Sequence, residues 1–126
     1  MMGEGNIAAP QRRDAMTLPT PLPPAIDRYF ADNPEFDVER MLSPFAADAV
    51  VVDESKTRSG TEELRAWITE ATLGAKAVAT PVWATSEDGT HIVTANVAGA
   101  FPGSPVMLTF RFRLSEDKIA HLEIAP

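Results

Sequence analysis

The sequence predicts an α+β fold in which helices pack on one face of an antiparallel sheet. Residues 24–74 contain three stretches whose apolar side chains recur at helical spacing, and residues 77–124 contain four stretches rich in β-branched and aromatic residues. Helices grouped ahead of a run of strands are typical of α+β proteins, whereas regular alternation of the two predicts a parallel sheet. The 126 residues suffice for one domain with one core.

The first 23 residues are expected to form a flexible arm ahead of a domain at residues 24–126. Four prolines interrupt a segment that has neither helical nor strand periodicity: Pro10, Pro19, Pro21 and Pro23. A disordered leader is the simpler interpretation. The alternative is an arm that folds back on the domain or on a partner subunit.

Three helices are predicted in the first half of the domain. The first begins at Pro24, because a proline in the first turn costs no hydrogen bond, and ends at Asn33, because the residue before a proline avoids the helical region. Asp37 is placed to cap the second helix, whose apolar stripe extends to Phe45. The third helix begins near Thr61, its expected cap.

Five strands are predicted. The first is residues 49–53, a run of β-branched residues, and a polar loop at residues 54–58 follows it. The other four strands are separated by turn residues and lie near residues 77–86, 91–101, 106–114 and 118–124.

The last hairpin is predicted in more detail. A three-residue loop at residues 115–117 would place apolar residues opposite one another on one face. These pairs are Phe112/Ala120, Phe110/Leu122 and Leu108/Ile124. A one-residue slip would mix apolar and polar side chains, so this register is favoured. The other face would carry Thr109, Arg111, Ile119 and His121.

Composition and charge exclude several classes of protein. The formal net charge is -7, whereas nucleic acid and anionic membranes require basic patches. Without cysteine the chain forms no disulfide and no zinc–thiolate site, and its two histidines have no acidic cluster beside them. The apolar runs are too short to span a membrane, and the N-terminus lacks a secretory pattern. We therefore expect a soluble, cytoplasmic protein that binds neither nucleic acid nor membrane and uses no cofactor or metal ion.

Tyr29 and Asp53 are the candidate catalytic residues. Tyr29 lies in the apolar stretch of the first helix, and Asp53 follows four apolar residues at the end of the first strand. At the edge of one apolar cavity they would form a proton-transfer pair, because a partly desolvated carboxylate is a better base and a phenol can donate to a carbonyl oxygen. Taken alone, a core tyrosine and an aspartate that caps a loop are the simpler interpretation.

The chain resembles a known superfamily. The motif Phe-Ala-Ala-Asp-Ala-Val-Val-Val-Asp at residues 45–53, Gly60 opening a helix and four long strands after it are similar to the NTF2-like proteins, which include SnoaL-like polyketide cyclases and ketosteroid isomerases. The resemblance covers roughly residues 24–125. It implies a cone in which three N-terminal helices pack on a curved, mostly antiparallel sheet around an apolar pocket. It also implies a homodimer through the outer sheet face.

The resemblance extends to individual residues. Ketosteroid isomerases use a tyrosine on the first helix and an aspartate ending the first strand, and Tyr29 and Asp53 match these positions and their spacing. Those enzymes add a protonated second aspartate to the oxyanion hole. Alignment on residues 110–112 puts Leu108 at that position, so half of this oxyanion hole is absent.

Two functions follow from the resemblance. The first is an isomerase or cyclase that acts on a small apolar carbonyl compound. The second is a non-catalytic ligand-binding or dimeric assembly module, because fold does not fix function. The pocket of the second would hold a lipid-like ligand or be packed shut. A small apolar molecule in the pocket would contact inward-facing side chains, and the candidates are Trp67, Leu108, Phe110, Phe112 and Leu122.

Overall fold

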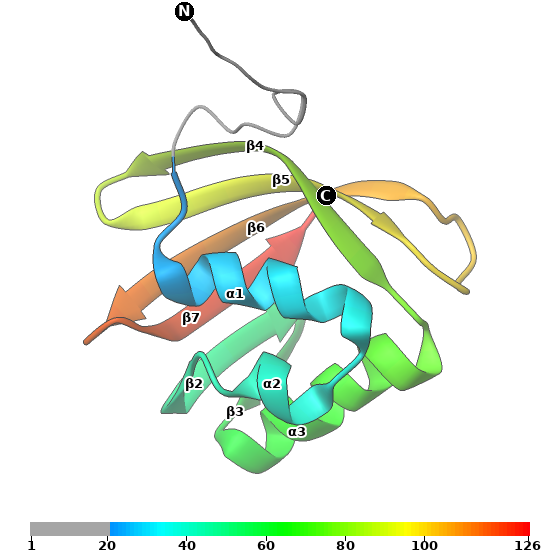
Figure 1. Cartoon of the computed structure of the whole chain (residues 1–126), viewed down its shortest axis with the longest axis horizontal. Helices are drawn as coiled ribbons and strands as arrows, with labels where there is room; N and C mark the ends of the chain where they lie inside the picture. Colours follow the sequence, from blue (N-terminus) through cyan, green and yellow to red (C-terminus); the bar gives the residue numbers. More distant parts are fainter. Residues whose placement is uncertain (1–20) are drawn as a thin grey trace, which may run out of the picture.

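The computed structural model describes residues 21–126 as helices packed on one six-stranded sheet (Figure 1). The strands are β2 (Phe45–Asp53), β3 (Lys56–Ser59), β4 (Val78–Glu87), β5 (Thr90–Ala98), β6 (Val106–Ser115) and β7 (Lys118–Ala125), in the spatial order β3-β2-β7-β6-β5-β4. Neighbouring strands are antiparallel except β2 and β7, which run parallel. The predicted α+β class and mostly antiparallel sheet are confirmed. The predicted arm lies outside the described residues, apart from residues 21–23.

The helices lie together on one face of the sheet (Figure 1). They are α1 (Pro24–Asp32), α2 (Val38–Leu42) and α3 (Thr61–Thr69), with a 3-10 turn, η2 (Asn33–Glu35), after α1 and a π-helical turn, η3 (Glu70–Gly74), after α3. Only α1 and α2 precede the sheet, because α3 follows the β2–β3 hairpin. The prediction that all three helices are N-terminal to the sheet is therefore not confirmed.

The helix ends agree in part with the sequence. Pro24 occupies the first turn of α1, and the side chain of Asp37 accepts a hydrogen bond of 3.1 Å from the backbone N–H of Arg40 at the start of α2. Thr61 is not the cap of α3. Gly60 occupies that position with a φ of 85°, a left-handed value that glycine adopts without strain.

The first hairpin was not predicted. Glu54 and Ser55 have φ values of 54° and 63°, so they form a two-residue turn, and the expected polar loop continues as strand β3. Two-residue hairpin turns usually carry glycine or asparagine where φ is positive. The sequence of this turn therefore gives no such signal.

The register of the last hairpin differs from the prediction. The turn has two residues, Glu116 and Asp117, both with positive φ, and Ser115 pairs with Lys118. The register of the pairing then shifts between Arg113 and Leu114. As a result Phe112 pairs with Leu122 rather than with Ala120. Ile119 is consequently a fully buried core residue and not part of the outer face.

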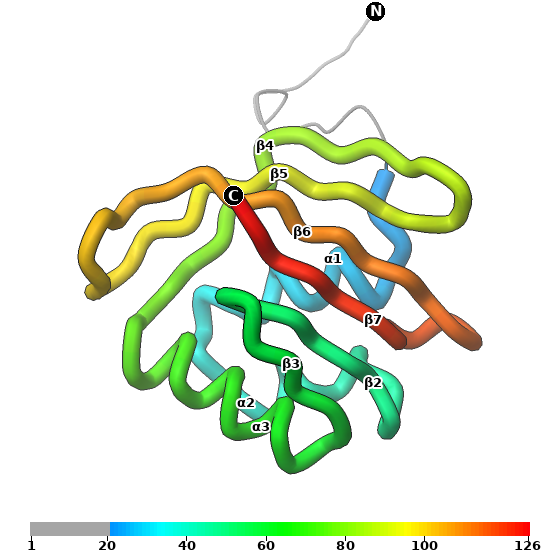
Figure 2. The backbone as a smooth tube through the Cα atoms, turned by 180° about the vertical axis from the view of Figure 1, so that it is seen from behind, coloured from blue at the N-terminus to red at the C-terminus, as the bar shows by residue number. Residues whose placement is uncertain are grey.

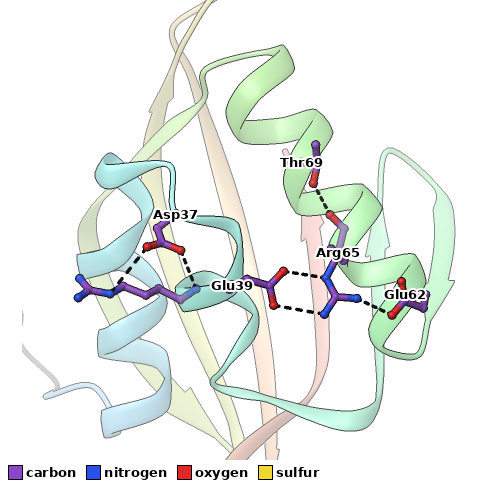
Figure 3. A network of polar contacts seen from close by, with 6 residues as sticks. Asp37, Glu39, Glu62, Arg65 and Thr69 are labelled. Carbon is purple, nitrogen blue, oxygen red and sulfur yellow. Dashed lines mark hydrogen bonds and ion pairs between the residues drawn. The ribbon is translucent and has the colours of Figure 1, made fainter.

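A polar network on the surface fixes α3 relative to α2 (Figure 3). The guanidinium of Arg65 on α3 donates from Nε to Glu39 of α2 at 2.7 Å and also to Glu62 one turn earlier. Such exposed ion pairs contribute little stability individually. The network lies on the exposed side of α3, while Leu64, Trp67 and Ile68 on the same helix are buried in the core.

Asn33 attaches the end of α1 to the sheet. Its side-chain oxygen accepts a hydrogen bond of 2.7 Å from the backbone N–H of Ala79, and its Nδ2 donates to the carbonyl of Ala77 at 3.0 Å. The buried amide of Asn33 thus makes the hydrogen bonds that a neighbouring strand would otherwise make with the backbone at the start of β4. This contact joins the helical layer to the strand that follows α3.

Candidate active site

Asp53 points to the inner face of the sheet. In a strand, alternate side chains face the same side, and Ala49 and Val51, which share the side of Asp53, are fully buried. Asp53 pairs with Ile124 of β7 in the parallel ladder and is the last residue of β2. The carboxylate therefore lies where the buried strand ends, only partly exposed to solvent.

Trp67 on α3 holds this carboxylate. The indole Nε1–H donates a hydrogen bond of 2.9 Å to Oδ2 of Asp53. Trp67 is 4% exposed, and its ring meets that of Phe45 edge-on with centroids 6.3 Å apart. A buried indole N–H requires an acceptor and a buried carboxylate requires donors, so each group satisfies the other. Sequence reasoning proposed Trp67 only as a pocket wall.

Tyr29 lies inside an aromatic cluster beneath the sheet. Its ring centroid is 5.1 Å from that of Phe30, 5.8 Å from Phe112, 6.0 Å from Phe45 and 6.3 Å from Phe110. Burial raises the pKa of the phenol well above its ordinary range, and the negative charge of Asp53 raises it further. The phenol is therefore protonated at neutral pH and can act as a hydrogen-bond donor.

Tyr29 and Asp53 line one internal cavity. Its volume is about 70 Å³, and its remaining lining is almost entirely apolar. Small-molecule pockets usually measure about 300–1,000 Å³, so the cavity as it stands holds only a small molecule or a few waters. The two residues come from α1 and the end of β2, 24 positions apart in the sequence.

The structure separates the predicted pocket residues into two groups. Trp67, Leu108 and Phe110 line the cavity together with Tyr29 and Asp53. Phe112 and Leu122 are fully buried core residues that do not contribute to its wall. The difference follows from position along the strands, because Phe112 and Leu122 pair with each other away from the cavity.

Several lining residues were not predicted from the sequence. They are Asn33, Met41, Ile68, Ala71, Thr72, Ala77, Ala79, Val97 and Ile124. Most are small or aliphatic and carry no chemical signal. Ala71 and Thr72 belong to the π-helical turn η3, and such turns are frequent at functional sites.

The described part of the chain offers no metal centre and no membrane span. Within residues 21–126, no three histidine, cysteine, aspartate or glutamate side chains come together as metal ligands. No helix among these residues is long and apolar enough to cross a bilayer.

A curved sheet around helices, with an acid and a phenol in the apolar space between them, defines an α+β protein with an internal pocket. Comparison with solved structures identifies similar molecules. A proposed polyketide cyclase from Sinorhizobium meliloti is 38% identical, with a TM-score of 0.77 over 82% of this chain and 94% of that chain. The chain belongs to the NTF2-like superfamily and is a SnoaL-like domain.

Two more distant structures share the fold. A Catenulispora acidiphila protein with a ketosteroid isomerase-like fold, solved in complex with trimethylamine, is 18% identical with a TM-score of 0.72, covering 84% of this chain and 87% of that one. SalBIII, an epoxide hydrolase/cyclase-like enzyme of pyran ring formation in the polyether salinomycin, is 18% identical with a TM-score of 0.70, covering 80% and 86%. No protein-family model matches the chain, and no curated protein does.

The ionisation of Tyr29 can be measured directly, because the chain contains one tyrosine. We predict that the phenolate absorbance develops well above the ordinary phenol pKa of about 10. Asp53→Asn should lower the midpoint without returning it to the ordinary value, because burial is the larger cause. Since the folded-state pKa is raised, stability from this group is complete below about pH 10 and is lost as pH rises through the folded value.

Circular dichroism recorded in parallel with the absorbance controls for alkaline unfolding. A midpoint at the ordinary phenol value in a protein that remains folded would contradict the burial of Tyr29 beside Asp53.

Proposed function

We propose that the protein is a cofactor-independent isomerase or cyclase that transfers a proton on a small apolar carbonyl compound. The observation that carries this proposal is the presence of Asp53 and Tyr29 in one apolar cavity, where burial and, to a smaller degree, the charge of Asp53 raise the pKa of Tyr29. An acid and a base whose environments separate their protonation states are the usual components of proton-transfer sites.

The proposed reaction begins with a C–H bond next to a carbonyl. The Asp53 carboxylate takes this proton, and the electron pair moves onto the carbonyl oxygen to form an enolate. The neutral Tyr29 hydroxyl donates a hydrogen bond to that oxygen as negative charge develops there. In a β,γ-unsaturated ketone this enolate is conjugated, and protonated Asp53 returns the proton to the γ carbon, which gives isomerisation. In a dicarbonyl compound the enolate carbon instead attacks the second carbonyl, which closes a ring, and protonated Asp53 gives its proton to the new alkoxide oxygen.

Two features of the site bear on the rate of this step. Trp67 fixes one carboxylate oxygen, so the base is held in one orientation. Leu108 lines the cavity where the family's ketosteroid isomerases carry a second acid, so Tyr29 acts without that partner. We therefore expect slower enolisation than in those isomerases, and the similarity to a proposed polyketide cyclase favours cyclisation over steroid isomerisation.

The alternative function is a non-catalytic binding or assembly module. One observation favours it: the cavity of about 70 Å³ is smaller than most ligand sites. An assembly module would keep this space closed by Trp67 and Phe110, which are 4% and 3% exposed.

A homodimer through the outer sheet face is part of both proposed functions, the enzyme and the assembly module. Figure 2 shows this face, with α1 on the far side of β6 and β7. Trp83 on β4 is 55% exposed there and lies in register with Thr94 of β5. Arg111 of β6 and Glu123 of β7 are paired across strands on the same face. Opposite charges and an exposed aromatic on one sheet face suit a self-complementary twofold contact.

The catalytic proposal predicts that the protein accelerates deuterium uptake at the α-carbons of cyclopentanone in heavy water, followed by NMR. Asp53→Asn should reduce the protein-catalysed rate by about 10²-fold or more, the usual contribution of a general base. Tyr29→Phe should reduce it by about 10²-fold, because one donor to the developing oxyanion is lost. Both variants should keep the wild-type circular dichroism spectrum.

Asp48→Asn is the matched control, since Asp48 is an exposed carboxylate on the same strand. Equal exchange rates for Asp53→Asn and wild type would remove Asp53 as the base. A wild type no faster than buffer would favour the assembly module.

The dimer proposal predicts that wild-type protein sediments as a dimer at micromolar concentration and that Trp83→Glu sediments as a monomer, because a charge replaces the exposed indole at the contact. Leu73→Glu is the control, since Leu73 is equally exposed at 54% but lies on η3, away from the sheet. A monomeric wild type would exclude the proposed contact.

A further inference from the structure

A second hollow lies on the other side of Trp67. It is an open groove of about 400 Å³ between β3 and α3. Ala66 and Trp67 form its apolar floor, and its rim is charged, with Lys56 and Arg58 from β3 facing Glu63 and Glu70 from α3 and its continuation. Among the described residues, Trp67 alone lines both this groove and the internal cavity.

Trp67 is therefore the partition between the two spaces, and the hydrogen bond to Asp53 holds it closed. Displacing the indole would have two effects at once. It would join the small cavity to a groove of about 400 Å³, which reaches the range of small-molecule sites. It would also release Oδ2 of Asp53, which accepts the indole N–H in the closed arrangement.

The charges on the rim are not equally available to a ligand. Glu63 accepts a hydrogen bond of 2.8 Å from the backbone N–H of Ser59, and Glu70 lies 3.7 Å from Arg58. Arg58 also donates to the backbone oxygen of Asp53 at 3.4 Å. Lys56 is exposed, and within residues 21–126 it has no ion-pair partner. An anionic group in the groove would therefore meet Lys56.

We infer that cavity and groove are two compartments of one substrate site, divided by Trp67, and that the substrate is a carbonyl compound with a flexible chain ending in an anionic group. The carbonyl head occupies the inner cavity between Asp53 and Tyr29, the chain crosses the floor of the groove, and the anion lies at Lys56. The inference rests on the proposed function and adds to it the substrate class and the route past Trp67.

Three probes with one cyclic ketone head test this arrangement: cyclopentanone, 7-(2-oxocyclopentyl)heptanoate and the primary amide of that acid. Affinities are measured by isothermal titration calorimetry, and the position of Trp67 is followed by its indole N–H NMR signal, which Trp83→Phe distinguishes from that of the other tryptophan. The acid should bind at least about tenfold more tightly than cyclopentanone, because its chain is buried on the apolar floor. The acid should also bind more tightly than the amide.

Variants locate the chain. Ala66→Phe fills the groove and should remove the advantage of both chain-bearing probes, and Lys56→Ala should remove the difference between acid and amide. Ala31→Phe is the matched control, because Ala31 is an exposed alanine on helix α1 that lines neither space. The chain-bearing probes should shift the indole signal toward its position in Asp53→Leu, whereas cyclopentanone should not.

Equal affinities for the acid and cyclopentanone, or an unchanged acid affinity in Ala66→Phe, would overturn the two-compartment site while leaving the proton transfer of Asp53 intact. Cyclopentanone exchange that survives Asp53→Asn would instead overturn the proposed function, whatever the chain contributes.

Discussion

The hydrogen bond between the Trp67 indole and the Asp53 carboxylate is the contact on which the site depends. It joins α3 to the end of β2 and holds an acid at the inner face of a buried strand. Neither group is stable there alone, because a buried donor or acceptor without a partner costs more than the pair gains. Helix α3 presents Trp67 to this site with its buried face and contacts Glu39 of α2 through Arg65 on its exposed face.

The helices and strands could largely be predicted in their order along the chain, because each depends on residues that are close together in the sequence. Pro24 at a helix start, Asp37 as a cap and a strand at the β-branched run of residues 49–53 all follow from short-range effects. The tight turn at residues 54–55 was missed, and the turn at residues 116–117 was predicted one residue too long, because the residues of both turns adopt positive φ without glycine. Tertiary pairing of the strands imposes that conformation against local preference, and one such turn moved Ile119 from the surface into the core.

The candidate site was predictable to a similar degree. Tyr29 and Asp53 were found as polar residues in apolar stretches, and the fold brings both to one cavity. The hydrogen bond between Trp67 and Asp53 was not predicted, although a buried indole N–H needs an acceptor. That rule requires an acceptor for the indole N–H but does not identify it, and Asp53 lies 14 positions before Trp67 in the sequence. The cavity volume could not be predicted from the sequence, because it is the small space that is left after many side chains have packed together.

The small volume connects structure and proposed chemistry. Burial among aromatic and aliphatic groups, with a smaller effect from the charge of Asp53, raises the pKa of Tyr29 and keeps the phenol protonated. The same packing excludes a large substrate until a wall moves, and Trp67 is the wall that two spaces share. The fold supplies a family and a scaffold, while the chemistry depends on these few side chains.

The most direct test of the central contact is hydrogen exchange of the two indole N–H groups in nitrogen-15-labelled wild type and Asp53→Leu. We predict that the Trp67 N–H exchanges faster in Asp53→Leu, because the indole has then lost its acceptor. The exchange of the Trp83 N–H, which belongs to a side chain that is 55% exposed, should be the same in both proteins. A Trp67 N–H that exchanges equally fast in wild type and in folded Asp53→Leu would contradict the account.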